Sequence, residues 1–247
     1  MKVKFLGTNN WYDTDTGNTP CVFIDYPECY IAFDAGFGFY KLENQIKDER
    51  PIYVFLSHFH LDHIIGLFTM DEFKLKQAIN IFGPPKTKEI LNNFMRPPIA
   101  FHLDKLSYKV NINELSEGAH STPIPITCKY LLHNIPIFGY CIERGKKSIA
   151  YCTDTGLCDN LLELANDVDL LILECAFKSG ETNPKWPHIN PEVAGEIGKR
   201  CKPKKLVITN FDAKRYTNIK DRENAEKIVK SIYKNVVAAK DGMALKI

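Results

Sequence analysis

The chain has 247 residues, of which 45% are hydrophobic and 25% charged, with a formal net charge of +2 at pH 7. This length fits one domain, residues 1–247, with a substantial core, and the small net charge excludes a strong overall attraction to nucleic acid or membrane. No apolar run approaches membrane-spanning length and the N-terminus lacks a signal peptide's apolar region, so we expect a cytoplasmic protein without a membrane partner.

Strand patterns dominate the first part of the chain. The expected strands cover residues 3–6, 21–25, 30–33 and 52–56, and a helical spacing lies over 39–47. Residues 11–19 between the first two strands are polar and rich in turn formers, so we expect a loop beside a strand end. Asp34 closes the third strand.

The strand at 52–56 leads into residues 57–63, which hold three of the seven histidines. In a nearly extended loop His58 and His60 point the same way and can bind one ion. Asp62 and His63 follow as the chain turns into a helix, where they can reach a second ion. Imidazole suits zinc, iron and other transition metals, and carboxylate adds a harder oxygen ligand. This spacing predicts a metal site, against the alternative of a solvated histidine-rich turn.

The remaining elements alternate between helical and strand patterns. Helices are expected over 68–79, 86–95, 160–165, 191–200 and 222–233, and strands over 79–82, 170–173 and 205–209. Residues 106–151 are β-rich, and two short strands flank Asp241 and Gly242. The alternation indicates a layered α/β fold. The eight cysteines form no C-x-x-C pair, which excludes a zinc ribbon and a thioredoxin-like motif.

Two later residues become ligand candidates because a two-metal site needs partners and strand ends converge in a layered fold. His133 lies between two apolar runs, where a lone histidine is more often a core residue. Asp154 follows a strand, where a lone aspartate is more often a turn residue, yet its two oxygens can bridge two ions. In the same context Asp34 is a candidate for orienting a metal ligand. His188 precedes a helix and by itself reads as a surface residue.

Residues 58–63 match the H-x-H-x-D-H motif of the metallo-β-lactamase superfamily. Over almost its whole length the chain resembles the ribonuclease Z-like and phosphonate-pathway cyclic phosphodiesterase branch. Asp34 falls in the first motif of that branch, His133 in the third, Asp154 in the fourth and residues 206–211 in the fifth. The second motif is highly specific, and the others are informative only in this order.

The resemblance implies a four-layer αββα sandwich with a metal site at one edge of its two sheets. It also implies one or two divalent ions, with zinc favoured over manganese or iron. One ion would be held by His58, His60, His133 and Asp154, and the second by Asp62, His63 and the shared Asp154. His188 matches the histidine that this branch uses near the leaving group.

The chain departs from the family pattern at two places. Asn210 stands where this branch usually carries a histidine for the second metal, and an amide oxygen is a weaker transition-metal ligand than imidazole. The second ion is therefore expected to bind loosely through Asn210 or water, to be absent, or to use Asp212. In addition, residues 134–153 are too few for the long arm found in tRNA-processing ribonuclease Z proteins of the common type.

The resemblance implies a metal-dependent hydrolase that cleaves a small or cyclic phosphodiester with a metal-bound hydroxide. His188 would protonate the leaving oxygen, and Asp62 would bind metal and help to orient the nucleophile. An RNA-processing nuclease is the first alternative; the missing arm and modest charge disfavour nucleic acid as the substrate. Hydrolysis of a lactone or thioester and a degenerate metal-binding protein are the others. The sequence leaves homodimer formation open.

Overall fold

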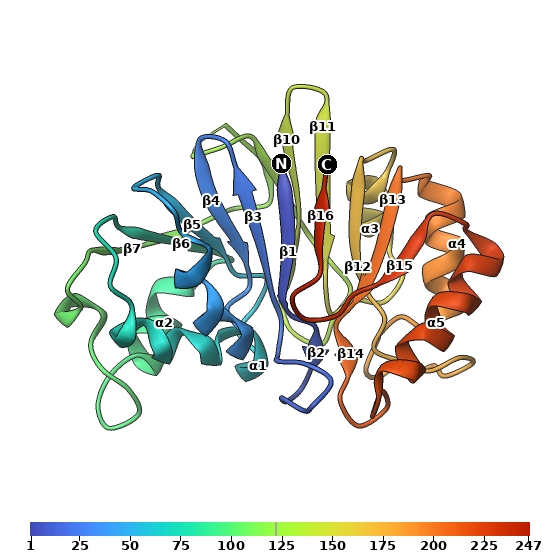
Figure 1. Cartoon of the computed structure of the whole chain (residues 1–247), viewed down its shortest axis with the longest axis horizontal. Helices are drawn as coiled ribbons and strands as arrows, with labels where there is room; N and C mark the ends of the chain where they lie inside the picture. Colours follow the sequence, from blue (N-terminus) through green and yellow to red (C-terminus); the bar gives the residue numbers. More distant parts are fainter. Residues whose placement is uncertain (122) are drawn as a thin grey trace.

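Two seven-stranded sheets face each other in the computed structural model, which describes residues 1–121 and 123–247 (Figure 1). In order across the first sheet lie β16 (Ala244–Lys246), β1 (Lys2–Gly7), β3 (Cys21–Tyr26), β4 (Cys29–Phe33), β5 (Ile52–Phe55), β6 (Ile79–Gly83) and β7 (Val110–Glu114). In order across the second lie β15 (Val236–Ala238), β13 (Lys205–Thr209), β12 (Leu170–Glu174), β11 (Lys147–Cys152), β10 (Phe138–Arg144), β9 (Ile126–Tyr130) and β8 (Gly118–His120).

Helices cover the outer face of each sheet. The second sheet carries α3 (Asp159–Ala165), α4 (Pro191–Cys201) and α5 (Ile219–Ile232). The first carries α1 (Leu61–Ile64), α2 (Thr87–Phe94) and the 3-10 helices η1 (Phe37–Lys41), η2 (Glu43–Gln45), η3 (Ile65–Glu72) and η4 (Leu103–Lys105). These layers confirm the predicted αββα sandwich. None of the helices in the described residues is long and apolar enough to cross a membrane.

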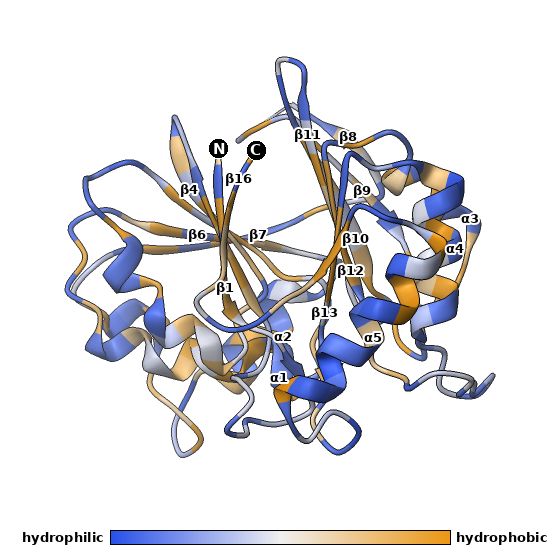
Figure 2. Cartoon of the chain, turned by 45° about the vertical axis from the view of Figure 1, so that its right-hand side comes forward, coloured by the Kyte–Doolittle hydropathy of each residue, from blue (hydrophilic) through white to orange (hydrophobic). Residues whose placement is uncertain are grey.

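The core lies in three apolar layers, one between the sheets and one beneath each set of helices. Between the sheets, Phe33 stacks on Tyr151 with ring centroids 4.9 Å apart and also contacts Tyr140. Because both faces of β4 and β12 are covered, all of their residues are buried, and the two strands are apolar throughout except for Glu174 at the end of β12. Figure 2 shows the strands as mainly hydrophobic and α4 and α5 with hydrophilic outer faces.

Four of the predicted helices are present within three residues of their expected limits. At α4 the Asn190 side chain accepts a hydrogen bond from the Val193 N–H, and Pro191 occupies the first turn. At α5 the Asn218 side chain accepts from the Asp221 N–H, so the helix begins three residues before the predicted start.

The predicted helices over 39–47 and 68–79 are wrong. The first is two short 3-10 helices, and the second is the 3-10 helix η3, which ends at Glu72. The buried residues Leu67, Met70 and Phe73 recur every third position. This spacing fits the three residues per turn of a 3-10 helix as well as it fits one face of an α-helix, which explains the error.

The parallel strands of both sheets end at one common edge, the lower edge in Figure 1, where α1 and two short strands lie. Those strands, β2 (Asn9–Asn10) and β14 (Phe211–Asp212), pair in parallel. Just beyond the ends of β4, β11 and β13, the residues Asp34, Asp154 and Asn210 have φ values of 56°, 44° and 56°. Asp and Asn adopt this left-handed conformation more readily than most residues. Ligands of α/β proteins commonly bind at such an edge.

Candidate metal centre

Four of the predicted ligands meet at this edge. His58, His60, His133 and Asp154 each offer a ligand atom, and these atoms all lie within 4.8 Å of one another. The Nδ1 atom of His60 is 3.0 Å from the Nε2 atom of His58 and 3.3 Å from that of His133. Burial lowers the pKa of all three imidazoles, to about 4 for His133, so that their nitrogen lone pairs are free. Three imidazoles and one carboxylate fit a zinc-type ion.

Hydrogen bonds on the far side of the His58 ring fix which nitrogen faces the centre. The Nδ1 atom of His58 is 2.9 Å from the Ser57 Oγ atom, which in turn donates to the Asp34 carboxylate at 2.9 Å. Because the Ser57 proton is used on Asp34, His58 Nδ1–H is the donor to Ser57. The Nε2 atom of His58 is then the free ligand atom, an arrangement typical of metal-binding histidines.

Asp34 lies behind the centre and is completely buried. Its carboxylate accepts hydrogen bonds from the Ser57 N–H at 2.7 Å, the Tyr151 hydroxyl at 2.7 Å and the Nδ1 atom of His63 at 2.8 Å. One carboxylate thus contacts His63 directly and His58 through Ser57, the position that the predicted orienting role requires.

His63 and Asp62 lie on the other side of Asp154. The Nε2 atom of His63 is 3.3 Å from Asp154 Oδ1 and 3.6 Å from Asp62 Oδ2, and it has no hydrogen-bond partner among the described residues. Burial lowers the pKa of His63, but the carboxylates of Asp154, Asp62 and Asp34 outweigh burial and raise it well above the ordinary value. The position between His63 Nε2 and the carboxylates of Asp154 and Asp62 suits a second cation.

Asn210 is buried beside the same Asp154 oxygen. Its Nδ2 atom donates a hydrogen bond to Asp154 Oδ1, while its Oδ1 atom has no partner among the described residues. The amide therefore competes for the Asp154 oxygen that faces His63. The carboxylate of Asp212, the alternative ligand predicted from the sequence, pairs with Arg215 at 2.7 Å and accepts the backbone N–H of Lys214.

Replacing Asn210 with histidine is expected to tighten the second ion by ~10–100-fold, because imidazole is the better ligand and no longer donates to Asp154. Histidine also tolerates the left-handed backbone at this position. Metal content after dialysis and activity against added Mn²⁺ or Zn²⁺ measure the effect, with Asn210→Ala as the control that removes the amide without adding a ligand. Two tight ions in the natural chain, held no better by Asn210→His, would contradict this account.

His188 lies next to the centre, with its ring centroid 5.5 Å from that of His133. Its Nδ1 atom is 2.8 Å from the carboxylate of Glu174, which is completely buried. Burial lowers the pKa of His188, but the Glu174 carboxylate outweighs burial and raises it to about 9. The imidazole can therefore carry a proton at neutral pH.

Glu174 was not predicted as a site residue, and the strand expected from the sequence ended one residue before it, at position 173. The backbone N–H groups of Ala176 and Ile189 donate to its Oε2 atom at 3.2 Å and 3.3 Å, and that of Thr155 donates to Oε1. These bonds hold the carboxylate in place behind His188. The available signal was a single charged residue at the end of a wholly apolar strand.

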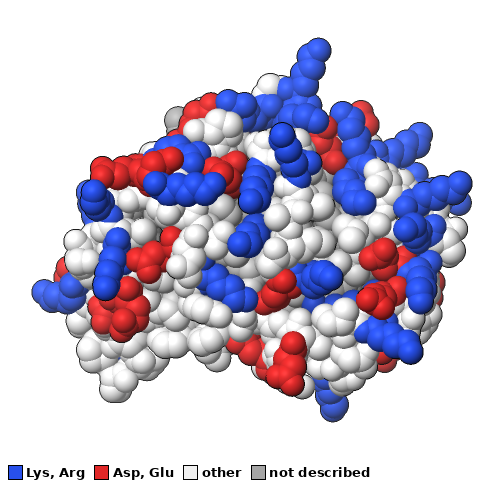
Figure 3. All heavy atoms as spheres, viewed as in Figure 1, with Lys and Arg blue, Asp and Glu red and all other residues white. Residues whose placement is uncertain are grey.

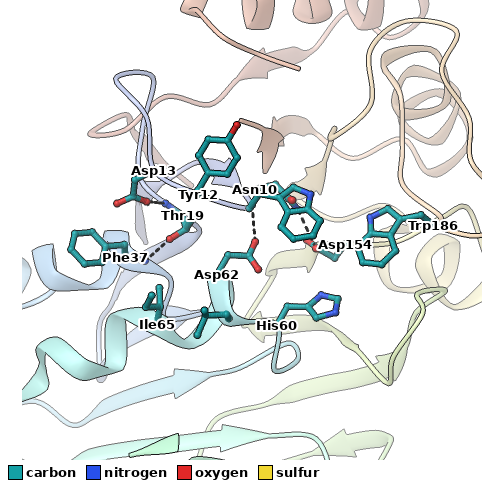
Figure 4. Close-up of a pocket in the computed structure, with 12 residues that line it drawn as sticks. Asn10, Tyr12, Asp13, Thr19, Phe37, His60, Asp62, Ile65, Asp154 and Trp186 are labelled. Atoms are coloured by element: carbon teal, nitrogen blue, oxygen red, sulfur yellow. Dashed lines mark hydrogen bonds between the residues drawn. The ribbon is translucent and has the colours of Figure 1, made fainter. Parts of the chain in front are cut away.

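A cavity of about 320 Å³ opens beside the centre, and Figure 4 shows His60, Asp62, Asp154 and Trp186 around it. Residues 11–19 form the loop that the sequence predicted, and its residues Trp11, Tyr12, Asp13 and Thr19 line one side of the cavity. The Trp11 N–H donates to Asp62 Oδ2 at 2.9 Å. The Asn10 amide donates to Asp154 Oδ2 at 3.1 Å. These two contacts, absent from the prediction, join the loop and β2 to the centre.

Comparisons with known proteins agree with this architecture. Residues 30–211 match the family described as Beta-lactamase superfamily domain. A ribonuclease Z from Rippkaea orientalis is 26% identical over 313 aligned positions, covering 100% of this chain and 98% of the relative. The metallo-beta-lactamase fold protein YhfI from Bacillus subtilis superposes with a TM-score of 0.81 at 22% identity, covering 99% of each chain. Human tRNase Z, short form, superposes at 0.76 with 24% identity, covering 100% of this chain and 99% of that one.

Proposed function

Since the chain belongs to the beta-lactamase superfamily domain family, we propose that this metal-dependent hydrolase cleaves a small phosphodiester. The observation that carries the proposal is the position of His188, a buried imidazole paired with Glu174 beside a four-ligand metal centre. A protonated group so placed serves a reaction whose leaving oxygen needs a proton. The ribonuclease Z relatives, which are named as RNA-cleaving enzymes, support phosphorus rather than carbon as the reacting centre.

We assign each residue of the site a role in the reaction according to its position. His58, His60, His133 and Asp154 would hold a divalent ion, which supplies Lewis-acid chemistry and lowers the pKa of a bound water. Asp62 accepts the Trp11 N–H and faces the cavity, where it can orient the attacking water. His188 lies on the Trp186 side of the centre, and from there it would donate its proton to the leaving oxygen.

The size and charge of the cavity favour a small substrate over RNA. None of the described residues that line it is Lys or Arg, whereas RNA binding relies on cations that contact successive phosphates. In Figure 3, Lys and Arg gather over the upper part of the face, and uncharged and acidic residues predominate along the lower edge. The alignment with the relative spans 313 positions, so the relative carries segments that this 247-residue chain lacks.

The test compares substrate classes on the metal-loaded protein, with metal content measured on the same sample. We expect turnover of bis(p-nitrophenyl) phosphate and of a cyclic nucleotide, and little cleavage of a precursor tRNA. A kcat/KM for precursor tRNA far above that for the small diesters would favour the RNA-processing alternative. Turnover of a lactone or thioester without any phosphodiester cleavage would move the reaction to carbon.

A further inference from the structure

We propose that Trp11 and Trp186 form a stacking platform for a planar aromatic group of the substrate, next to the reacting phosphate. The inference deepens the proposed function and rests on it. The two indole rings lie nearly parallel, with centroids 5.9 Å apart and an interplanar angle of 8°. Both line the cavity beside the metal centre, and Trp186 also lies parallel to the His60 ring at 5.9 Å and 12°.

The exposure of Trp11 points to a ligand. Its side chain is 55% exposed, and the neighbouring Tyr12 is 50% exposed. The apolar surface of two large aromatic side chains at the mouth of a cavity stays in contact with water, at a cost in free energy, unless a ligand covers it. The walls of the cavity also include Phe37 and Ile65, so an apolar ring is better matched here than a sugar-phosphate chain.

The loop that carries Trp11 is held in place from below. The Asn9 side chain donates to the Tyr12 carbonyl at 3.1 Å and the Gly17 carbonyl at 2.9 Å. Arg222, buried beneath the loop, donates to Asn9 and to the Thr16 hydroxyl at 3.0 Å. A platform fixed in this way binds a flat ring with little loss of conformational entropy.

The platform is also tied to the metal centre, because the Trp11 N–H donates to Asp62 and Trp186 packs on His60. A ring stacked there would lie close to the reacting phosphate, joined to it through an ester oxygen as in an aryl phosphodiester or through a ribose as in a nucleotide. None of the described residues of the cavity wall is Lys or Arg, so the wall offers no cation to a further anionic group. The negative charge of the substrate would therefore come from the phosphate alone. The substrate class is therefore an aromatic phosphodiester with a single anionic group.

The chain has two tryptophans and both belong to this platform, so intrinsic tryptophan fluorescence reports on it alone. We would titrate the zinc-loaded protein with phenylphosphonate and with methylphosphonate, which share a head group and differ in the ring. Phenylphosphonate is expected to bind ~10-fold more tightly and to change the emission, consistent with the usual contribution of aromatic stacking. Trp11→Ala should abolish the difference while the Kd of methylphosphonate, measured by calorimetry, stays unchanged.

Matched variants separate stacking from loop damage. Trp11→Phe keeps an aromatic face and should keep most of the preference, and Ile99→Ala, 68% exposed and outside the cavity lining, should keep all of it. A second pair of ligands, AMP and ribose 5-phosphate, differs only in the nucleobase. If the ratio of Kd values within this pair exceeds the ratio for the two phosphonates, the platform prefers a nucleobase; if it is smaller, the platform prefers a simple aryl group. Equal binding of the two phosphonates overturns the platform and leaves the proposed function standing. Failure of both phosphonates to bind overturns both.

Discussion

Replacing His188 with alanine is expected to lower turnover by ~10²–10⁴-fold while metal content stays close to that of the natural chain. The imidazole lies outside the four-ligand set, so its loss should not empty the centre. The loss should shrink for substrates that release p-nitrophenolate, because this leaving group needs no proton. Turnover of aryl and alkyl diesters, with metal content measured in parallel, decides the outcome.

Glu174→Gln provides a sharper version of this test. The amide keeps the volume of the carboxylate but removes the charge that raises the pKa of His188. As a positioning residue, Glu174 should affect poor leaving groups more than good ones, and a purely structural role would not produce this difference. His102→Ala, an exposed histidine elsewhere in the chain, is the matched control. Equal losses for good and poor leaving groups would assign His188 to binding instead.

The part of the site that could be predicted is the part encoded within a few residues. His58, His60, Asp62 and His63 lie so close in sequence that their chemistry is readable without a fold. His133 and Asp154 are single residues that became candidates only because the histidine-rich loop needed further ligands and strand ends converge, and the resemblance to a family then placed them in its motifs. Asn10 and Trp186 carried no such signal, because their roles depend on contacts such as the one between Asn10 and Asp154, 144 positions apart.

The fold divides along similar lines. Buried strands such as β12 were predictable because every residue is apolar up to the final glutamate. The segment from η1 to η3 was not, because a three-residue spacing of buried side chains does not separate α from 3-10 helix. The paired strands β2 and β14 have two residues each, too few for any periodic pattern, yet they place Asn10 against Asp154.

Replacing His60 with alanine is expected to empty the four-ligand centre. The variant removes one of three imidazoles whose nitrogens converge. Even the loss of a residue that only hydrogen-bonds to a metal ligand commonly reduces metal affinity by about 10–100-fold. Because the ion contributes several kcal/mol of charge stabilisation, turnover should fall by ~10³-fold or more. The metal-to-protein ratio after dialysis is the direct measurement, and activity on bis(p-nitrophenyl) phosphate is the second.

Comparison with Asp154→Ala extends the argument to the number of ions. Asp154 Oδ2 is 3.9 Å from His58 Nε2 and its Oδ1 is 3.3 Å from His63 Nε2, so this carboxylate faces both ligand sets. Its loss should release every bound ion, whereas His60→Ala should spare an ion held by Asp62 and His63. The imidazole of His120 lies away from the centre, within hydrogen-bond distance of the Ser116 carbonyl, so His120→Ala should leave the metal-to-protein ratio unchanged. An unchanged metal content in His60→Ala would remove His60 from the ligand set and with it the geometry proposed for the reaction.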